Sequence, residues 1–312
     1  MKILRIFSVV SLFAVAAWAQ DDTIRVATNL VTLNVSVSDR NGKAATGLKL
    51  SDFRLTDNGK PQEIESFSDA AAPVSYGIVY DQHQTADDQT RSVLAALKQF
   101  TSKLGGSDDF FVTVFNDRGS LTTEFVPTID QISKQADAGA RSLFDAIFAA
   151  SDRMAKARNH KRVLLVLTDG ADHNSQHSYK ELRNHLRSVN LPVYAITFSN
   201  NDRTMFGYSD IFRDGPRSRI NYGDADALDR GAIAELSKTS GGQAYDGNMR
   251  NQVYLATLCT MVGEEVRSQY VLGFYPDALD GKYHKLKVTV VGQKEKKFKV
   301  GSRKGYQSPK KS

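Results

Sequence analysis

Beyond Pro73 the chain alternates short, unbroken apolar runs with segments of helical periodicity, and this alternation constrains the fold more than any other feature. Apolar runs of four to six residues suit strands that are buried on both faces, as in a parallel sheet. Strands that alternate with helices are typical of a doubly wound α/β domain. We therefore expect a mostly parallel, Rossmann-like sheet over residues 73–267, with strands at 77–80, 110–115, 163–167 and 193–198.

An antiparallel pattern precedes this region. Apolar and polar residues alternate strictly over 30–37, and turn sequences follow at Asn41-Gly42 and Asn58-Gly59. Strict alternation predicts a strand with one buried face, and Asn-Gly is a hairpin turn signal. Residues 20–72 are therefore predicted to form a small antiparallel β module.

The C-terminal part is strongly basic. Residues 282–312 contain eleven Lys and Arg against one acid, Glu295, whereas the chain between residue 20 and this segment has 28 basic and 34 acidic residues. We expect a β hairpin segment over 268–306 and a basic tail over 307–312. Lys on the outside of an edge hairpin protects it from aggregation, but a Lys-rich hairpin also suits an anionic envelope polymer. Both interpretations stay open, and the acidic body argues against nucleic acid as a partner.

The N-terminus has the pattern of a secretory signal peptide over residues 1–19. Lys2 and Arg5 precede an apolar run, and Ala17-Trp18-Ala19 fits the small-x-small cleavage rule. The run is too short to span a bilayer comfortably. We expect an exported protein that starts at Gln20, is periplasmic or secreted, and has no transmembrane segment in its mature chain.

Two of the predicted strands run directly into acidic residues. Asp81 follows the run at 77–80, and Asp169 follows the run at 163–167 after one threonine. In an open parallel sheet, ligands bind beyond the carboxyl ends of the strands. A carboxylate at this position caps a helix, faces water or binds a cation. The two acids therefore mark a candidate site.

These residues resemble the von Willebrand factor type A (VWFA) domain, because Asp81 and Thr85, a segment around Arg141, and Leu-Thr-Asp169-Gly occur in that order. The flanking β segments look similar to the exported acidobacterial-type VWFA-related family. The resemblance implies a non-catalytic binding module with a metal-ion-dependent adhesion site, in which Asp-x-Ser-x-Ser, a Thr and an Asp hold Mg²⁺. A carboxylate of an extracellular or periplasmic protein partner would complete the coordination.

The sequence departs from that motif at two positions. Asp81, Thr85 and Asp169 match the first Asp, the second Ser and the late Asp, whereas His83 replaces the first Ser and Arg141 replaces the Thr. His83 removes an oxygen from the octahedral shell that Mg²⁺ requires. The guanidinium of Arg141 is suited to bridge two carboxylates in place of the ion. We therefore expect a degenerate site, and a divalent cation (Mg, Mn or Zn) remains the alternative.

Two other readings remain open. His83, His173 and His177, with Asp81 or Asp169, form a candidate zinc site and, with it, a metal-dependent hydrolase. The other reading is a structural or assembly component of the envelope that is held by its basic hairpin. The sequence has none of the common nucleophile, phosphate-loop or zinc-peptidase motifs, so we expect no catalytic residues and no enzyme.

A long polar loop over 199–225 mixes arginine with aromatic residues. Side chains of these types dominate the energetic centres of protein interfaces. The loop is therefore a candidate partner-binding segment, with contacts at Arg203, Phe206, Tyr208 and Arg213. A flexible insertion with no binding role is the alternative.

Overall fold

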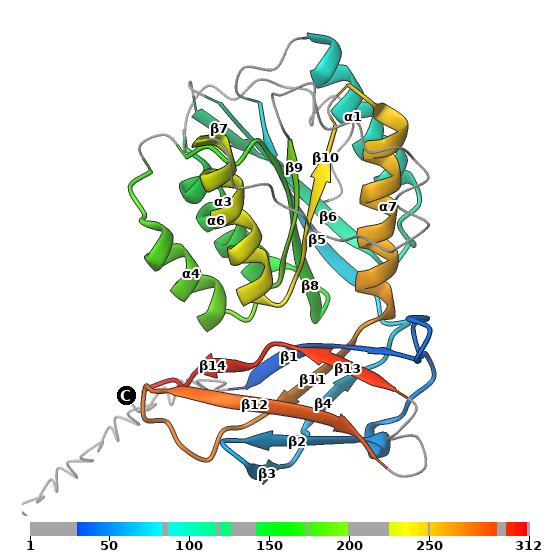
Figure 1. Ribbon diagram of the computed structural model, residues 1–312, viewed down its shortest axis with the longest axis vertical. Helices are drawn as coiled ribbons and strands as arrows, with labels where there is room; N and C mark the ends of the chain where they lie inside the picture. The colour runs from blue at the N-terminus through cyan, green and yellow to red at the C-terminus, as the bar shows by residue number, and fades with distance from the viewer. Residues whose placement is uncertain are drawn as a thin grey trace, which may run out of the picture.

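The computed structural model consists of two stacked units, an α/β unit and a β sandwich (Figure 1). The structure describes residues 30–82, 87–116, 119–125, 142–172, 175–198, 225–248, 250–291 and 298–310. The predicted signal peptide lies outside these residues. None of the helices in this described part combines the length and the apolar character that crossing a bilayer requires.

The α/β unit is built on a six-stranded sheet with the strand order β10-β9-β8-β5-β6-β7. All neighbours pair in parallel except β6 and β7. Every residue of β5 and β9 is buried, which explains the unbroken apolar runs and confirms the predicted doubly wound fold. The strands are β5 (Val74–Asp81), β6 (Asp109–Asn116), β7 (Gly119–Thr122), β8 (Lys161–Thr168), β9 (Val193–Phe198) and β10 (Ala244–Gly247).

Helices cover both faces of this sheet (Figure 1). On one face, α1 and α7 pack against a core in which Cys259 is fully buried, and burial raises the pKa of its thiol to about 12. On the other face, α3, α4 and α6 cover the second core. The helices are α1 (Asp87–Ser102), α3 (Leu143–Arg153), α4 (Tyr179–Ser188), α6 (Ala225–Ser240) and α7 (Gln252–Ser268), with short 3-10 turns η1 (Leu50–Asp52) and η2 (Met154–Lys156).

The β sandwich combines strands from both ends of the chain. Its two sheets have the orders β13-β1-β11-β4 and β14-β12-β2-β3, and they enclose one core that includes the aromatic cluster of Phe53, Phe67 and Tyr270. The strands are β1 (Val31–Ser38), β2 (Phe53–Asp57), β3 (Lys60–Gln62), β4 (Ser66–Ser68), β11 (Tyr270–Phe274), β12 (Tyr283–Val290), β13 (Lys299–Ser302) and β14 (Gly305–Gln307).

The prediction that the two C-terminal strands pair with each other as a hairpin is wrong. β12 and β13 lie in different sheets, because β12 pairs with β2 and β14, whereas β13 pairs with β1. This arrangement places Val288 of β12 and Val300 of β13 against the same core from opposite sides. The N-terminal strands β1 and β2 therefore pair with C-terminal strands, β1 with β11 and β13 and β2 with β12. Local alternation predicts strands but does not specify which strand is the partner.

A chain of hydrogen bonds links the two units. Asn34 of β1 donates to Gln269 at 3.1 Å, and the amide of Gln269 donates to the hydroxyl of Tyr194 at 2.8 Å. The hydroxyls of Tyr194 and Tyr245 both donate to Glu265 of α7, at 3.0 and 2.6 Å. Gln269 is buried, so the sandwich and the α/β unit share a polar contact that water does not replace.

A buried lysine lies at the same junction. The Nζ atom of Lys161, at the start of β8, donates to the backbone oxygens of Ala70 and Arg267 at 3.2 and 3.0 Å. Burial lowers the pKa of Lys161 to about 8, and the nearby carboxylate of Asp69 opposes this effect. The side chain therefore ties the linker before β5 to the end of α7.

We expect Gln269→Ala to reduce the free energy of unfolding by roughly 1–3 kcal/mol, because Asn34 loses its acceptor and the hydroxyl of Tyr194 loses one of its two hydrogen-bond partners. Urea unfolding followed by circular dichroism measures the change. Gln99→Ala, which removes an exposed glutamine from α1, is the matched control. If the two variants lose the same free energy of unfolding, the hydrogen bonds of Gln269 between the units do not contribute to stability.

His284 is buried in the sandwich between two carboxylates. Its Nδ1 lies 2.9 Å from both carboxylate oxygens of Asp57, and its Nε2 lies 3.1 Å from Asp280. The hydroxyl of Tyr306 also donates to Asp57, at 2.8 Å. Burial by itself lowers the pKa of His284, but the hydrogen bonds and charges of Asp57 and Asp280 outweigh it, so the pKa is raised.

The raised pKa predicts a pH-dependent stability. The imidazolium stabilises the fold fully below its unfolded-state pKa of about 6.5, and this contribution is lost as the pH rises through the higher folded-state pKa. We therefore expect the difference in unfolding free energy between wild type and His284→Gln to be largest in mild acid and to shrink above neutrality. His160→Gln, at an exposed position, is the control. A difference that is constant with pH would contradict the assignment.

Candidate functional site

A row of polar side chains crosses the carboxyl edge of the parallel sheet. Thr197 pairs with Thr168 on one side and with Asp246 on the other, and the register of β5 and β8 brings Asp81 beside Thr168. Alternate residues before them in the same strands belong to the core under α3, α4 and α6, so the four side chains point to that face. The row therefore joins the ends of four neighbouring strands.

Hydrogen bonds hold the centre of this row. Thr168 Oγ1 donates to the carboxylate of Asp81 at 2.9 Å and accepts from the backbone N–H of Gly170 at 3.0 Å. Thr168 is fully buried and Asp81 is 5% exposed. The hydroxyl of Thr168 therefore holds the carboxylate of Asp81 from the neighbouring strand. The same hydroxyl also binds the first turn of the loop after β8.

Backbone geometry explains the glycine that follows Asp169. The carboxylate of Asp169 accepts from the backbone N–H of Ala171 at 2.9 Å. Gly170 has a φ of +92°, and a Cβ atom at this position would lie 2.9 Å from the backbone nitrogen of Arg230 on α6. Both the positive φ and the close approach require glycine. The Asp-Gly pair therefore turns the chain away from the sheet and against α6.

Asp246 is a second carboxylate in the row and was not predicted from the sequence. Thr197 Oγ1 lies 3.4 Å from its Oδ1. Burial raises the pKa of Asp246, and the charge of Arg230 and the hydrogen bond from Thr197 offset only part of this effect. β10 is too short to give a clear apolar run in the sequence. Only its pairing with β9, which places Asp246 beside Thr197, shows that Asp246 belongs to the row.

Two further acids anchor the loop between β8 and α4. Asp145 of α3 accepts from the backbone N–H groups of Gln176 and His177 at 2.9 and 3.0 Å, and Asp172 accepts from the backbone N–H of Phe144 at 3.0 Å. Burial raises the pKa of Asp145, but these amide bonds and the ring of His177 outweigh it, so the pKa is lowered. Asp145 lies four residues after Arg141. Its place beside this motif segment was the one sequence feature that could have marked it as a site residue.

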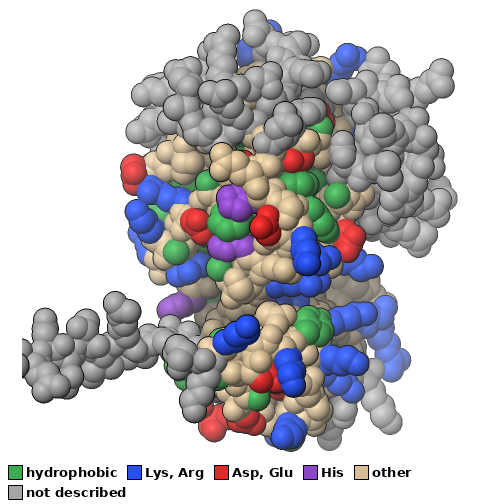
Figure 2. All heavy atoms as spheres, turned by 90° about the vertical axis from the view of Figure 1, so that its left-hand side faces the viewer, with side chains coloured by type: hydrophobic (Ala, Val, Ile, Leu, Met, Phe, Trp, Pro, Cys, Tyr) green, Lys and Arg blue, Asp and Glu red, His purple; other side chains and the backbone are tan. Residues whose placement is uncertain are grey.

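His177 belongs to an aromatic stack on α3 and α4. Its ring and the ring of His185 lie on opposite faces of Phe148, each with a centroid distance of 4.0 Å, and Figure 2 shows two histidines beside a hydrophobic side chain on this face. Nδ1 of His177 lies 2.7 Å from Asp145. Burial lowers the pKa of His185, with Asp152 opposing it. The zinc reading places His177 with Asp81 or Asp169, whereas its ring contacts Asp145 and Phe148.

Several predicted site residues lie outside the described residues. Asp81 and Asp169 lie at the edge as expected, but in the described part of the chain no three His, Cys, Asp or Glu side chains gather as a metal site. Mg²⁺ bound to a protein usually keeps several waters and needs only one or two carboxylates, so Asp81 and Asp169 supply two of the expected ligands and the described residues leave the fit of the ion untested. Outside the described residues are His83, Thr85, Arg141, His173, Arg203, Phe206, Tyr208 and Arg213.

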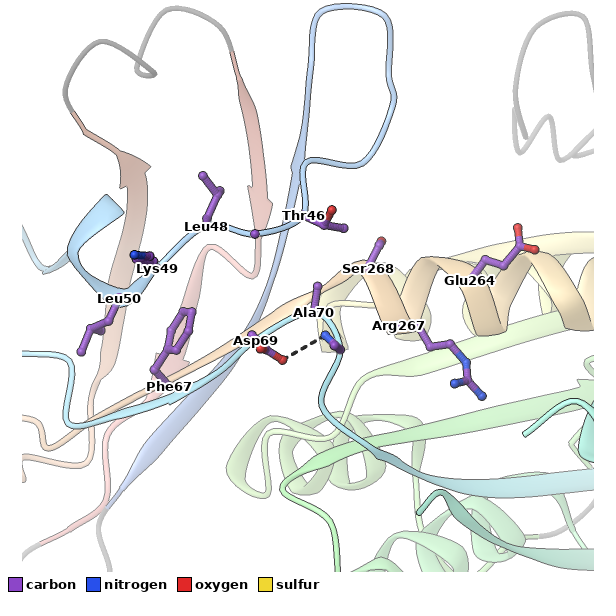
Figure 3. A pocket seen from close by; sticks show the side chains of 12 residues that line it. Thr46, Leu48, Lys49, Leu50, Phe67, Asp69, Ala70, Glu264, Arg267 and Ser268 are labelled. Atoms are coloured by element: carbon purple, nitrogen blue, oxygen red, sulfur yellow. Dashed lines mark hydrogen bonds between the residues drawn. The ribbon is translucent and has the colours of Figure 1, made fainter. Parts of the chain in front are cut away.

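A separate cavity of about 660 Å³ lies where the two units meet. Figure 3 shows Leu48, Leu50 and Phe67 from the sandwich side and Glu264 and Arg267 from the end of α7 around it. Asp81 and Asp169, which are predicted site residues within the described part of the chain, do not line this cavity. It lies at the sandwich junction, whereas the polar row lies at the strand ends.

Residues 79–207 match the family model of the von Willebrand factor type A domain. The matched segment contains Asp81, Thr168 and Asp169 and begins inside β5. No curated protein matches the chain.

Solved structures resemble the chain at low sequence identity. An aerotolerance-related membrane protein from Bacteroides fragilis NCTC 9343 is 14% identical, with 62% of this chain and 98% of that chain covered and a TM-score of 0.42. The conserved hypothetical protein BatB from Bacteroides thetaiotaomicron is also 14% identical, with 62% and 99% covered and a TM-score of 0.38. The SpRpn10 VWA domain is 11% identical, with 61% and 95% covered and a TM-score of 0.39.

We expect Thr168→Val to destabilise the protein by roughly 1–3 kcal/mol, because the buried carboxylate of Asp81 loses a donor and Gly170 loses an acceptor. Thr168→Ser keeps the hydroxyl and is expected to restore most of this loss. Chemical denaturation of the three proteins measures both effects. If valine and serine behave alike, the hydroxyl does not hold the site together.

Proposed function

We propose that this chain, whose residues 79–207 match the family model of the von Willebrand factor type A domain, is an exported, non-catalytic module that binds a protein partner at the carboxyl edge of its sheet. The row from Asp81 to Asp246 carries the proposal. It concentrates buried polar groups at the strand ends, where open parallel sheets bind ligands. Export rests on the signal-peptide pattern of residues 1–19, and mass spectrometry of the mature N-terminus tests it.

The partner surface extends into the segment after β9. β9 ends at Phe198 and α6 begins at Ala225, so the segment between them starts at the same edge as the polar row. Its Arg203, Phe206, Tyr208 and Arg213 have the side-chain types that dominate interface energetics. We assign the partner contacts to this segment together with the edge.

Recognition at this edge is proposed to be independent of metal. Arg141 replaces the threonine of the adhesion motif, and we propose that its permanent positive charge takes over the compensation that a cation would give Asp81 and Asp169. His83 in place of a serine removes an oxygen ligand. In this proposal the guanidinium of Arg141 takes the place of the cation, since a guanidinium can form bidentate hydrogen bonds with carboxylates.

Calorimetric titration of the untagged mature protein with Mg²⁺, Mn²⁺ and Zn²⁺ tests this proposal. We expect wild type to bind none of the three at millimolar concentration, because Arg141 stands in the sequence where the adhesion motif has a threonine ligand. Arg141→Thr is expected to gain Mg²⁺ binding, and adding Asp81→Ala to that variant is expected to abolish it. Asp152→Ala, which removes an exposed carboxylate of α3, is the matched control.

Tight Mg²⁺ binding by wild type, lost in Asp81→Ala, would instead restore a metal-dependent adhesion site. Binding of Zn²⁺ alone would favour the histidine site, and chelator-sensitive turnover of a substrate would replace the binding module with a hydrolase.

A further inference from the structure

We propose that the outer face of the sheet β14-β12-β2-β3 binds an acidic polysaccharide that lies along β12. This surface, called the basic face here, is formed by Arg54, Tyr283, Lys285 and Lys287. It belongs to the sandwich and not to the carboxyl edge of the α/β sheet. The inference is therefore independent of the proposed protein-binding site.

Strand register brings these side chains together. Residues of β12 alternate between exposed and buried, with Tyr283, Lys285 and Lys287 exposed and His284 and Leu286 buried in between. Successive exposed residues on one strand are about 6.6–6.8 Å apart. Arg54 of β2 pairs with Thr289 and is exposed, so it lies diagonally beside Lys287, at roughly 7–8 Å between backbone positions.

The basic face has no compensating negative charge within its own sheet. The only acid in its four strands is Asp57, which is buried and bound to His284 and Tyr306. In the part of the chain that the structure describes, no ion pair involves Arg54, Lys285 or Lys287. Like charges that face each other on a sheet destabilise it, so this arrangement favours an external anion.

Protection of a sheet edge does not explain these lysines. The sequence left open that Lys285 and Lys287 guard an edge hairpin against aggregation, but β12 is an interior strand with β14 on one side and β2 on the other. The pairing with β14 covers Tyr283 to Lys285, and the pairing with β2 covers Leu286 to Val290. The exposed side chains of β12 alternate with buried ones and so project from the face of the sheet. β12 is therefore not the free outer strand of a hairpin, and the edge argument does not single out these lysines.

Tyr283 adds an exposed aromatic surface to the cations. It is 49% exposed, and its phenol end lies against Gly305 of β14, where a Cβ atom would be 2.4 Å from the hydroxyl. Glycine thus leaves room for the ring to rest on the neighbouring strand. An amphipathic ring that packs on one side and faces water on the other, next to a row of cations, suits a sugar ring with a nearby carboxylate.

Other anionic partners fit this surface less well. Insertion into a membrane uses an apolar face, and Tyr283 is the only exposed large hydrophobic residue within these four strands as the structure describes them. Proteins that bind single-stranded nucleic acid stack successive bases on several aromatic side chains, whereas the basic face offers one. The combination favours a carboxylated polysaccharide.

Binding of full-length mature protein to polygalacturonate, a polymer of a carboxylated sugar, tests the inference. We expect affinity that falls with salt, and the combined variant Arg54→Gln, Lys285→Gln, Lys287→Gln to bind at least about tenfold more weakly. Tyr283→Ser is expected to weaken binding, whereas Tyr283→Phe retains it. The control variant, Lys98→Gln, Lys156→Gln, Lys180→Gln, removes the same charge from exposed positions of the α/β unit.

The comparison probes are neutral dextran, single-stranded DNA and vesicles that contain anionic lipid. Tighter binding to DNA or vesicles than to polygalacturonate, or equal losses in the basic-face and control variants, would overturn the inference. Thermal melts establish that each variant is folded. Asp81→Ala is expected to leave polymer binding unchanged, so failure here and failure of the proposed protein-binding function are distinguishable.

Discussion

Parallel pairing in register across β5, β8, β9 and β10 is the constraint on which the candidate site depends. Because the strands run in the same direction, their carboxyl ends meet at one edge, and residues distant in sequence become neighbours. Asp81 and Asp246 are separated by most of the domain along the chain, yet Thr168 beside Asp81 and Thr197 beside Asp246 are paired neighbours between them. Burial on both faces constrains this register, because a shift by one residue would exchange the side chains of a strand between two differently packed cores.

The sandwich adds a second constraint, since it is made from the two ends of the chain. β1 through β4 precede the α/β unit and β11 through β14 follow it. The α/β unit is thus inserted between strands that must pair with each other. Gln269, which lies between α7 and β11, and Lys161, at the start of β8, make the buried polar contacts at this junction.

This architecture separates three surfaces with different chemistry. The carboxyl edge holds the buried carboxylate of Asp81, the half-buried carboxylate of Asp246 and two buried hydroxyls, and the junction holds a mainly apolar-walled cavity. The outer sheet of the sandwich carries uncompensated cations. One chain is therefore able to hold a partner at one end and an anionic polymer at the other, as proposed above. The sheet that faces the α/β unit is uncharged along β1, where Thr32, Asn34 and Ser36 alternate with the core residues.

The sequence by itself determined the alternation of buried strands and helices, the positions of Asp81 and Asp169 at strand ends, and the glycine after Asp169. These features depend on local periodicity and backbone geometry, which short segments carry. Only the tertiary structure decided that β12 and β13 join different sheets, that Thr168 holds Asp81, and that Asp246 belongs to the same row. Each depends on pairing between strands far apart in the chain, and local hydrophobic patterns do not specify the partner of a strand.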